Sequence, residues 1–183
     1  LLTSLPGGLF DLKGLEYMSL ANNKIEDIPE NLGNLKNVHH FSIGGNRVRN
    51  IPSSIGQMHK LVTASFTHNA ISDIPEEVCD LENLRILWLS NNQVQTIPEC
   101  IGNLRSLEIF TLSKNNLISL PDSIKKLDLV YFGYHGNENL SLSDLQKEWV
   151  GKIDGAKKDK RGKKRYEEIM VFKNAIGKNF YDG

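Results

Sequence analysis

Histidine and cysteine are the side chains of this chain best suited to metal binding or nucleophilic attack, and their spacing favours neither activity. His39 and His40 are adjacent, whereas His59, His68 and His135 are scattered along the sequence. A zinc site needs three or four ligands that converge on one point, and this spacing supplies no such set. The chain also lacks a phosphate-binding glycine loop and the motifs G-x-S-x-G, H-E-x-x-H and C-x-x-C. We therefore predict no catalytic residue, no metal and no cofactor.

Prolines and asparagines mark a repeat of 23 residues. The six prolines are Pro6, Pro29, Pro52, Pro75, Pro98 and Pro121. Five asparagines keep the same interval, each six residues before a proline: Asn23, Asn46, Asn69, Asn92 and Asn115. Apolar residues recur around these markers, and the first complete unit has Leu15, Met18, Leu20, Ile25, Ile28, Leu32 and Leu35. This regularity predicts a stack of similar structural units.

One such unit cannot bury its own apolar side chains. In a strand, alternate residues face opposite sides, so we expect Met18 and Leu20 to point inward and Tyr17 and Ser19 to point outward. Units stacked about 4.8 Å apart bury the inward residues together and pair as a parallel sheet. The asparagine follows each strand, where its amide can satisfy backbone groups at the bend. We therefore interpret the asparagines as structural.

The pattern from about Leu2 to Asn137 resembles the leucine-rich repeat family, and its I-P-x-x-I-G-x-L ending is similar to cytosolic scaffold and Ras-group members. The resemblance implies an α/β fold, a right-handed solenoid with a curved parallel sheet on the concave side and 3₁₀, irregular or helical segments on the convex side. We expect about six strands in a domain of residues 1–137. The first repeat is incomplete, so we expect the natural protein to continue upstream with more repeats or a capping helix.

Residues 138–183 are expected to form a C-terminal cap and a basic tail. Ser143 with Gln146 three residues later matches the pattern of a capping box, which predicts a helix through about Lys152 that covers the end of the core. Its apolar side is expected to carry Leu142, Leu145, Trp149 and Ile153. A second helix is predicted from Tyr166 to Ile176, with Gly177 as its stop.

The outward residues of the strands form a continuous concave surface with little charge, which solenoids use for binding. We expect Trp88 to be exposed beside Ile86 and Ile109, and exposed aromatic groups of this kind mark interfaces. The alternatives are an incidental surface tryptophan or one that the tail covers. The candidate partner-binding residues are Tyr17, His40, Ser42, Ser65, His68, Ile86, Trp88, Ile109, Thr111, Tyr131 and His135.

Basic and acidic side chains balance at 22 each, which argues against a surface adapted to nucleic acid. No apolar run approaches the roughly 18 to 20 residues that span a bilayer. Residues 155–165 are strongly basic, and they form either a solvated linker or a site for an anionic partner, an anionic membrane or a localisation receptor. The anion-binding candidates are Lys157, Lys158, Lys160, Arg161, Lys163, Lys164 and Arg165.

The two cysteines, Cys79 and Cys100, lie outside any cysteine-rich flank of the kind that closes extracellular members of the family. They are 21 rather than 23 residues apart, so they occupy different positions of neighbouring units. We expect free thiols and a cytoplasmic location.

The predicted function is a non-enzymatic protein-interaction domain in intracellular signalling or scaffolding. The resemblance implies a small GTPase or a protein phosphatase as possible partners. The alternatives are a regulatory or substrate-recruiting module of a larger kinase, phosphatase, cyclase or ubiquitin ligase, or a bacterial effector.

Overall fold

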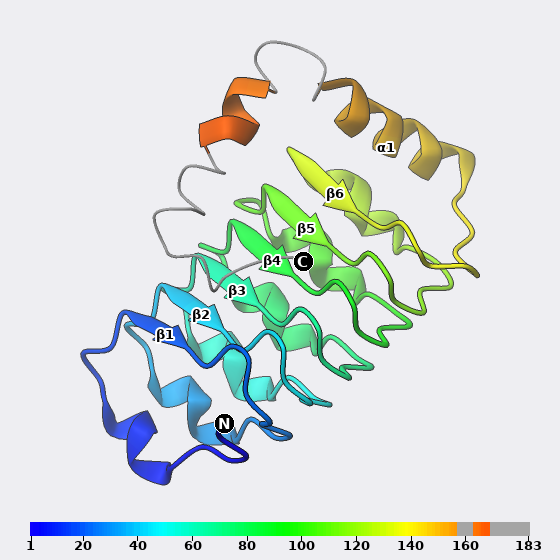
Figure 1. Ribbon diagram of the computed structural model, residues 1–183. Helices are drawn as coiled ribbons and strands as arrows, with labels where there is room; N and C mark the ends of the chain where they lie inside the picture. The colour runs from blue at the N-terminus through cyan, green and yellow to red at the C-terminus, as the bar shows by residue number, and fades with distance from the viewer. Residues whose placement is uncertain (157–162, 169–183) are drawn as a thin grey trace.

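The computed structural model describes residues 1–156 and 163–168, and its centre is a six-stranded parallel sheet (Figure 1). The strands lie side by side in sequence order, as stacking of consecutive repeats requires. They are β1 (Tyr17–Ser19), β2 (His40–Ser42), β3 (Thr63–Ser65), β4 (Ile86–Trp88), β5 (Ile109–Thr111) and β6 (Tyr131–Gly133). The predicted solenoid is confirmed.

Each repeat returns to the sheet through a short 3₁₀ helix on the convex side, and a proline stands directly before every one of these helices. The proline ring fixes φ near the extended value that the chain needs there. The helices are η1 (Gly7–Asp11), η2 (Glu30–Asn34), η3 (Ser53–Gln57), η4 (Glu76–Asp80), η5 (Glu99–Asn103) and η6 (Asp122–Lys126).

The main core lies between the sheet and the 3₁₀ helices. The middle residue of each strand points into it, so that Met18, Phe41, Leu87 and Phe110 are buried there as the alternation predicts. Neighbouring units contribute equivalent side chains, and the core therefore runs continuously along the stack.

The asparagines tie each unit to its neighbour. The amide of Asn92 donates to the carbonyl oxygens of Phe66 and Leu89, at 3.0 Å each. The N–H of Ile71 donates to the Asn92 side-chain oxygen at 3.0 Å. Equivalent bonds from Asn46, Asn69, Asn115 and Asn137 extend this ladder along the stack. The structural interpretation of the asparagines is confirmed.

The helix α1 (Asp144–Ala156) covers the open end of the core beyond β6 (Figure 1). Its capping box is formed, since the N–H of Gln146 donates to the Ser143 hydroxyl and the N–H of Ser143 donates to the Gln146 side chain. Trp149 is buried against the core, and its indole N–H donates to the Leu127 carbonyl oxygen at 3.3 Å.

One expected contact of this helix is wrong, because Leu145 is 62% exposed. The buried side of α1 instead carries Gln146, Trp149, Val150 and Ile153. The Gln146 side chain is buried because it donates to the Leu120 carbonyl oxygen at 2.9 Å, which turns Leu145 toward solvent.

The expectation of free thiols is also wrong, because Cys79 in η4 and Cys100 in η5 form a disulfide with a Cα–Cα distance of 5.8 Å. Neighbouring convex turns approach most closely between residues 21 positions apart. A methyl group added to Gly33, Gly56 or Gly102 would lie 2.9 Å from the Cβ atom of the residue 21 positions later. Cys79 takes the place of the glycine in this series, and its sulfur therefore meets that of Cys100.

We predict that Asn92→Ala lowers the free energy of unfolding by about 1–3 kcal/mol, because buried backbone groups lose their hydrogen-bond partner. Urea unfolding measures the change. Asn116→Ala is the matched control, since this exposed neighbour has no side-chain hydrogen bond within the described residues. Equal stability of the two variants would contradict the structural role of the ladder.

The Cys79–Cys100 bond should stabilise the fold by roughly 3 kcal/mol, because it closes a loop of about 20 residues in the unfolded chain. Unfolding of the wild type with and without dithiothreitol, alongside the double variant Cys79→Ser, Cys100→Ser, measures this contribution. The reduced wild type should match the double variant. A midpoint insensitive to reductant would show that the bond does not form.

Candidate functional site

The register of the sheet aligns the outward residues in rows along the concave side. His40 lies beside Thr63, Ile86 beside Ile109, and Ile109 beside Tyr131. In the next row Trp88 lies between Ser65 and Thr111. The continuous surface of outward residues predicted from the sequence therefore exists as rows, which bring the apolar candidates together on β4, β5 and β6.

Three of these side chains, Ile86, Trp88 and Ile109, form an apolar group with Val130, which directly precedes β6. This group is here called the concave cluster. It is separate from the main core, which already contains Leu87 and Leu89 of the same strand and turn. The expected exposure of Trp88 is wrong, because the residue is only 2% exposed. Tyr131 and Tyr166 pack against the cluster. Trp88 is therefore buried on the concave side and not between the sheet and the convex helices.

A helical segment at residues 163–168 places Tyr166 beside the cluster. The ring centroids of Tyr166 and Tyr131 are 6.0 Å apart. This helical turn lies at the start of the second helix predicted from Tyr166 to Ile176, and residues 169–176 of that prediction lie outside the described residues. Tyr166, which is distant in the sequence, thus packs against the part of the candidate surface formed by β4, β5 and β6.

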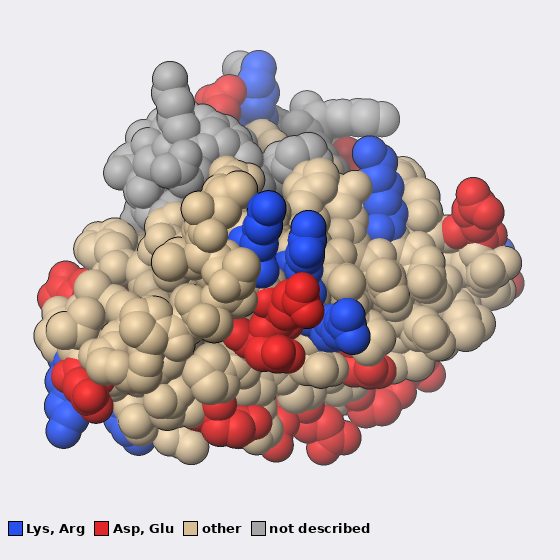
Figure 2. Space-filling view, turned by 60° about the horizontal axis from the view of Figure 1, so that its bottom comes forward, with Lys and Arg blue, Asp and Glu red and all other residues tan. Residues whose placement is uncertain are grey.

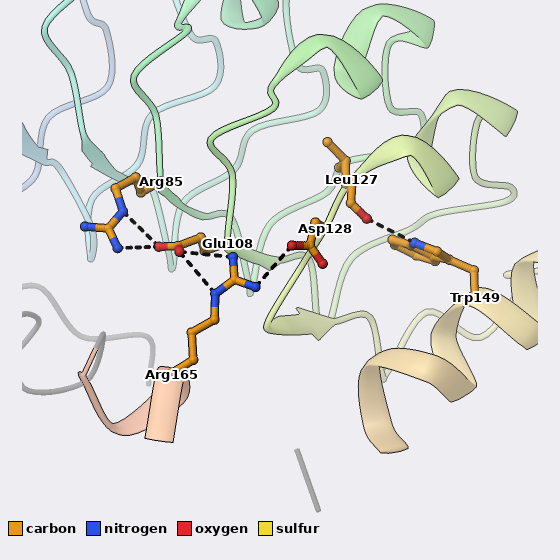
Figure 3. A network of polar contacts seen from close by, with 6 residues as sticks. All are labelled: Arg85, Glu108, Leu127, Asp128, Trp149 and Arg165. Atoms are coloured by element: carbon orange, nitrogen blue, oxygen red, sulfur yellow. Dashed lines mark hydrogen bonds and ion pairs between the residues drawn. The ribbon is translucent and has the colours of Figure 1, made fainter. Parts of the chain in front are cut away.

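Arg165 of the same segment binds two carboxylates, which lie just before the first residues of β5 and β6 (Figure 3). Its Nη2 atom lies 3.1 Å from Glu108 Oε1, and its Nη1 atom lies 3.1 Å from Asp128 Oδ2. On the other side of Glu108, the Nη2 atom of Arg85 lies 2.6 Å from Oε2. The Glu108 side chain is only 14% exposed and sits between the two guanidinium groups. Burial lowers the pKa of Arg165, but the hydrogen bonds with the two carboxylates outweigh it and the pKa is raised.

An open cavity of about 660 Å³ adjoins this network. Its lining has more cationic than anionic side chains and comprises His39, Lys60, Val62, Asn83, Arg85, Arg105, Ser106, Glu108 and Arg165. Figure 2 shows a mixed group of basic and acidic side chains in the middle of the view, with uncharged residues around it. The cavity therefore brings basic side chains together around the carboxylate of Glu108.

The other predicted surface residues differ in accessibility. Tyr17 is 57% exposed and stacks on the buried ring of His40, with ring centroids 4.7 Å apart. Ser42, Ser65 and Thr111 are buried along the rows. His68 and His135 are exposed at the strand ends, where His68 adopts a left-handed backbone with φ of 54°. The accessible part of the predicted surface therefore lies at β1 and at the strand ends.

Of the basic candidates, Lys157, Lys158, Lys160 and Arg161 lie outside the described residues. Lys163 and Lys164 are exposed, whereas Arg165 is engaged by Glu108 and Asp128.

Among residues 1–156 and 163–168, no group of three or more potential metal ligands lies together. No helix within these same residues has the length and apolar character needed to cross a membrane.

Family models described as leucine-rich repeat match residues 14–35 and 59–117, the same region that forms the stacked units. The chain is a leucine-rich repeat protein. No curated protein sequence matches it.

Solved structures resemble this leucine-rich repeat protein over most of its length. A leucine-rich repeat protein from Leptospira interrogans is 28% identical over 81% of this chain and 38% of its own, with a TM-score of 0.69. The plant peptide hormone receptor RGFR1 in complex with RGF2 is 31% identical over 76% of this chain and 23% of its own, with a TM-score of 0.66. An internalin from Listeria monocytogenes shares the fold at 24% identity, with a TM-score of 0.69 over 79% of this chain and 41% of its own. The present chain thus spans less than half the length of each.

The buried imidazole of His40 makes stability depend on pH. Burial, with a smaller contribution from the charge of His39, lowers the pKa of His40 from 6.5 to about 4. The folded state therefore binds fewer protons than the unfolded state, so this contribution to stability is complete above pH 6.5 and is lost as the pH falls through about 4.

We predict that wild-type stability falls between pH 7 and pH 5 by about 1–2 kcal/mol more than that of His40→Gln. Urea unfolding at the two pH values measures this difference. His59→Gln is the control, because His59 is exposed and its removal should leave the wild-type dependence in place. Identical pH dependence in wild type and His40→Gln would contradict the burial of a neutral imidazole.

Proposed function

We propose that this protein is a non-enzymatic interaction module that binds a partner protein on the concave side of its sheet, in signalling or scaffolding. Leucine-rich repeat domains are typically protein-interaction modules, and solenoids bind along their concave surface. The partner is expected to contact the region around β4, β5 and β6.

The observation that supports this proposal is the concave cluster. Ile86, Trp88 and Ile109 lie outside the main core, where packing of the solenoid does not require apolar side chains. Large aromatic groups near the centre of an interface carry a large share of its binding energy. Trp88 is therefore the proposed anchor for the partner, which takes the place of Tyr166 against the cluster.

The partner class and wider setting are proposals from resemblance. A small GTPase or a protein phosphatase is the class that similar cytosolic repeat proteins suggest. A regulatory module of a larger enzyme and a bacterial effector remain alternative settings for the same surface. Among the similar structures is the leucine-rich repeat ectodomain of the receptor kinase SOBIR1 from Arabidopsis thaliana, at 25% identity.

The redox state of the two cysteines bears on the cellular compartment of the protein. The cytoplasmic setting was expected from free cysteines, whereas the Cys79–Cys100 disulfide favours an oxidising compartment, since structural disulfides are rare in the cytosol. Trapping thiols with an alkylating agent in the native source, followed by mass spectrometry of both cysteines, decides between the two. Two alkylated thiols support the cytoplasm, and an intact disulfide supports an oxidising compartment.

We predict that Trp88→Ala weakens partner binding by on the order of 2 kcal/mol, about 30-fold in Kd, because the anchor is lost. Affinity purification from the native source with the wild-type chain identifies the partner, and calorimetry compares the variants. Ile118→Ala is the matched control, because Ile118 is an exposed apolar residue outside the strands. If Trp88→Ala binds every partner as tightly as Ile118→Ala, the concave surface is not the binding site.

A further inference from the structure

Residues 165 and 166 occupy a two-part site on the concave side. The first part is an acidic pair, Glu108 and Asp128, which holds the Arg165 guanidinium. The second part is the concave cluster with Tyr131, against which Tyr166 packs. An arginine followed directly by an aromatic residue therefore fits both parts at once.

The acidic pair is specific to the last repeats and is not part of the repeat pattern. Glu108 directly precedes β5. The residue before β1 is also acidic, Glu16, whereas those before β2, β3, β4 and β6 are His39, Val62, Arg85 and Val130. A stacked unit therefore does not need a carboxylate at this position. What is particular to this part of the surface is the combination of Glu108 with Asp128 around one guanidinium group.

The geometry of Glu108 favours a guanidinium ligand. Arg85 occupies Oε2 of Glu108 through both its Nε and Nη2 atoms, which fixes the carboxylate and leaves Oε1 directed to the other side. The Nε and Nη2 atoms of Arg165 both donate to Oε1, at 3.3 and 3.1 Å. Such forked donation suits the planar guanidinium and not the single ammonium of lysine.

We infer that the partner binds at this two-part site by presenting an arginine followed directly by an aromatic residue, in place of Arg165 and Tyr166. This inference rests on the proposed function of the concave surface and specifies the chemistry of the partner segment. Residues 165 and 166 act as an internal ligand that the partner displaces.

Displacement is feasible because the internal contacts are only partly buried. The Arg165 side chain is 42% exposed and that of Asp128 is 88% exposed, so water and salt weaken their attraction. The internal ligand holds its place through its tether, which supplies an effective concentration on the order of millimolar. A partner segment with the same chemistry and further contacts competes with it.

The probe for the test is the blocked peptide KKRYEE, which reproduces residues 163–168. It is titrated into the full chain and into the full-chain variant Arg165→Ala, Tyr166→Ala, in which the internal ligand is removed. Indole N–H signals in NMR spectra report binding, and Trp88→Phe assigns the two signals. We expect the peptide to bind the variant at least tenfold more tightly than the wild type and to shift the Trp88 signal, with Trp149 unmoved.

Two altered peptides test whether binding requires both the arginine and the aromatic residue. Peptides carrying Arg165→Lys or Tyr166→Ala should bind the double variant at least tenfold more weakly than KKRYEE does. Added salt should weaken the binding of KKRYEE itself. Should the double variant fold poorly, the single variant Arg165→Ala serves, because Glu108 keeps its pairing with Arg85. Equal binding of parent and altered peptides, equal binding to wild type and variant, or no shift of the Trp88 signal would each overturn the inference.

Failure of the inference is distinguishable from failure of the proposed function. If Trp88→Ala weakens partner binding as predicted but KKRYEE fails to bind, the concave surface is the interface and its specificity for arginine and an aromatic residue is wrong. If KKRYEE binds as expected but Trp88→Ala keeps every partner, the two-part site serves the internal segment alone and the inference about the partner is wrong.

Discussion

The structure depends on one constraint, which is that a 23-residue unit cannot bury its apolar residues or satisfy its backbone without a neighbour. The asparagine ladder satisfies the backbone N–H and C=O groups at the turns. Asn92 joins carbonyl oxygens of its own unit and of the preceding one, at Leu89 and Phe66, while it accepts from Ile71. Inward residues such as Leu87 and Phe110 form the shared apolar core, and α1 covers the last core residues where the stack ends.

Because the inward residues and the turns stabilise the fold, the outward residues of the strands are free to vary. The first repeats place Tyr17 and His40 there, and the later ones place Ile86, Trp88 and Ile109. Carboxylates beside these apolar residues add a site for a cation at the same end of the sheet. The surface is therefore uneven along the stack, with its apolar and acidic features together at β4, β5 and β6.

The sequence predicted the features that repeat or that act within a few residues. The prolines and asparagines, such as Pro98 and Asn92, recur at a fixed spacing, and Ser143 lies three residues before Gln146. The Arg85–Glu108 pair was also accessible to sequence reasoning, because the two residues lie at equivalent positions of adjacent units.

Contacts that break the repeat were not predictable in the same way. The disulfide joins positions offset by two residues between neighbouring turns, and its signal was the glycine series that Cys79 interrupts. The contact of Arg165 with Glu108 spans 57 residues and has no periodic signal at all. The cluster that contains Trp88 also packs against the distant residue Tyr166, so the periodicity predicted the row of Trp88 but not its burial.

The central claim is that Trp88 belongs to the concave wall of the sheet and not to the core behind it. Acrylamide quenching of tryptophan fluorescence tests this most directly, in chains with Trp149→Phe that either keep or lack residues 157–183. Removal of these residues takes away Tyr166 and leaves all six strands and α1. The account predicts a quenching constant several-fold higher in the shorter chain, while unchanged quenching in a folded shorter chain would place Trp88 in the core and contradict the account.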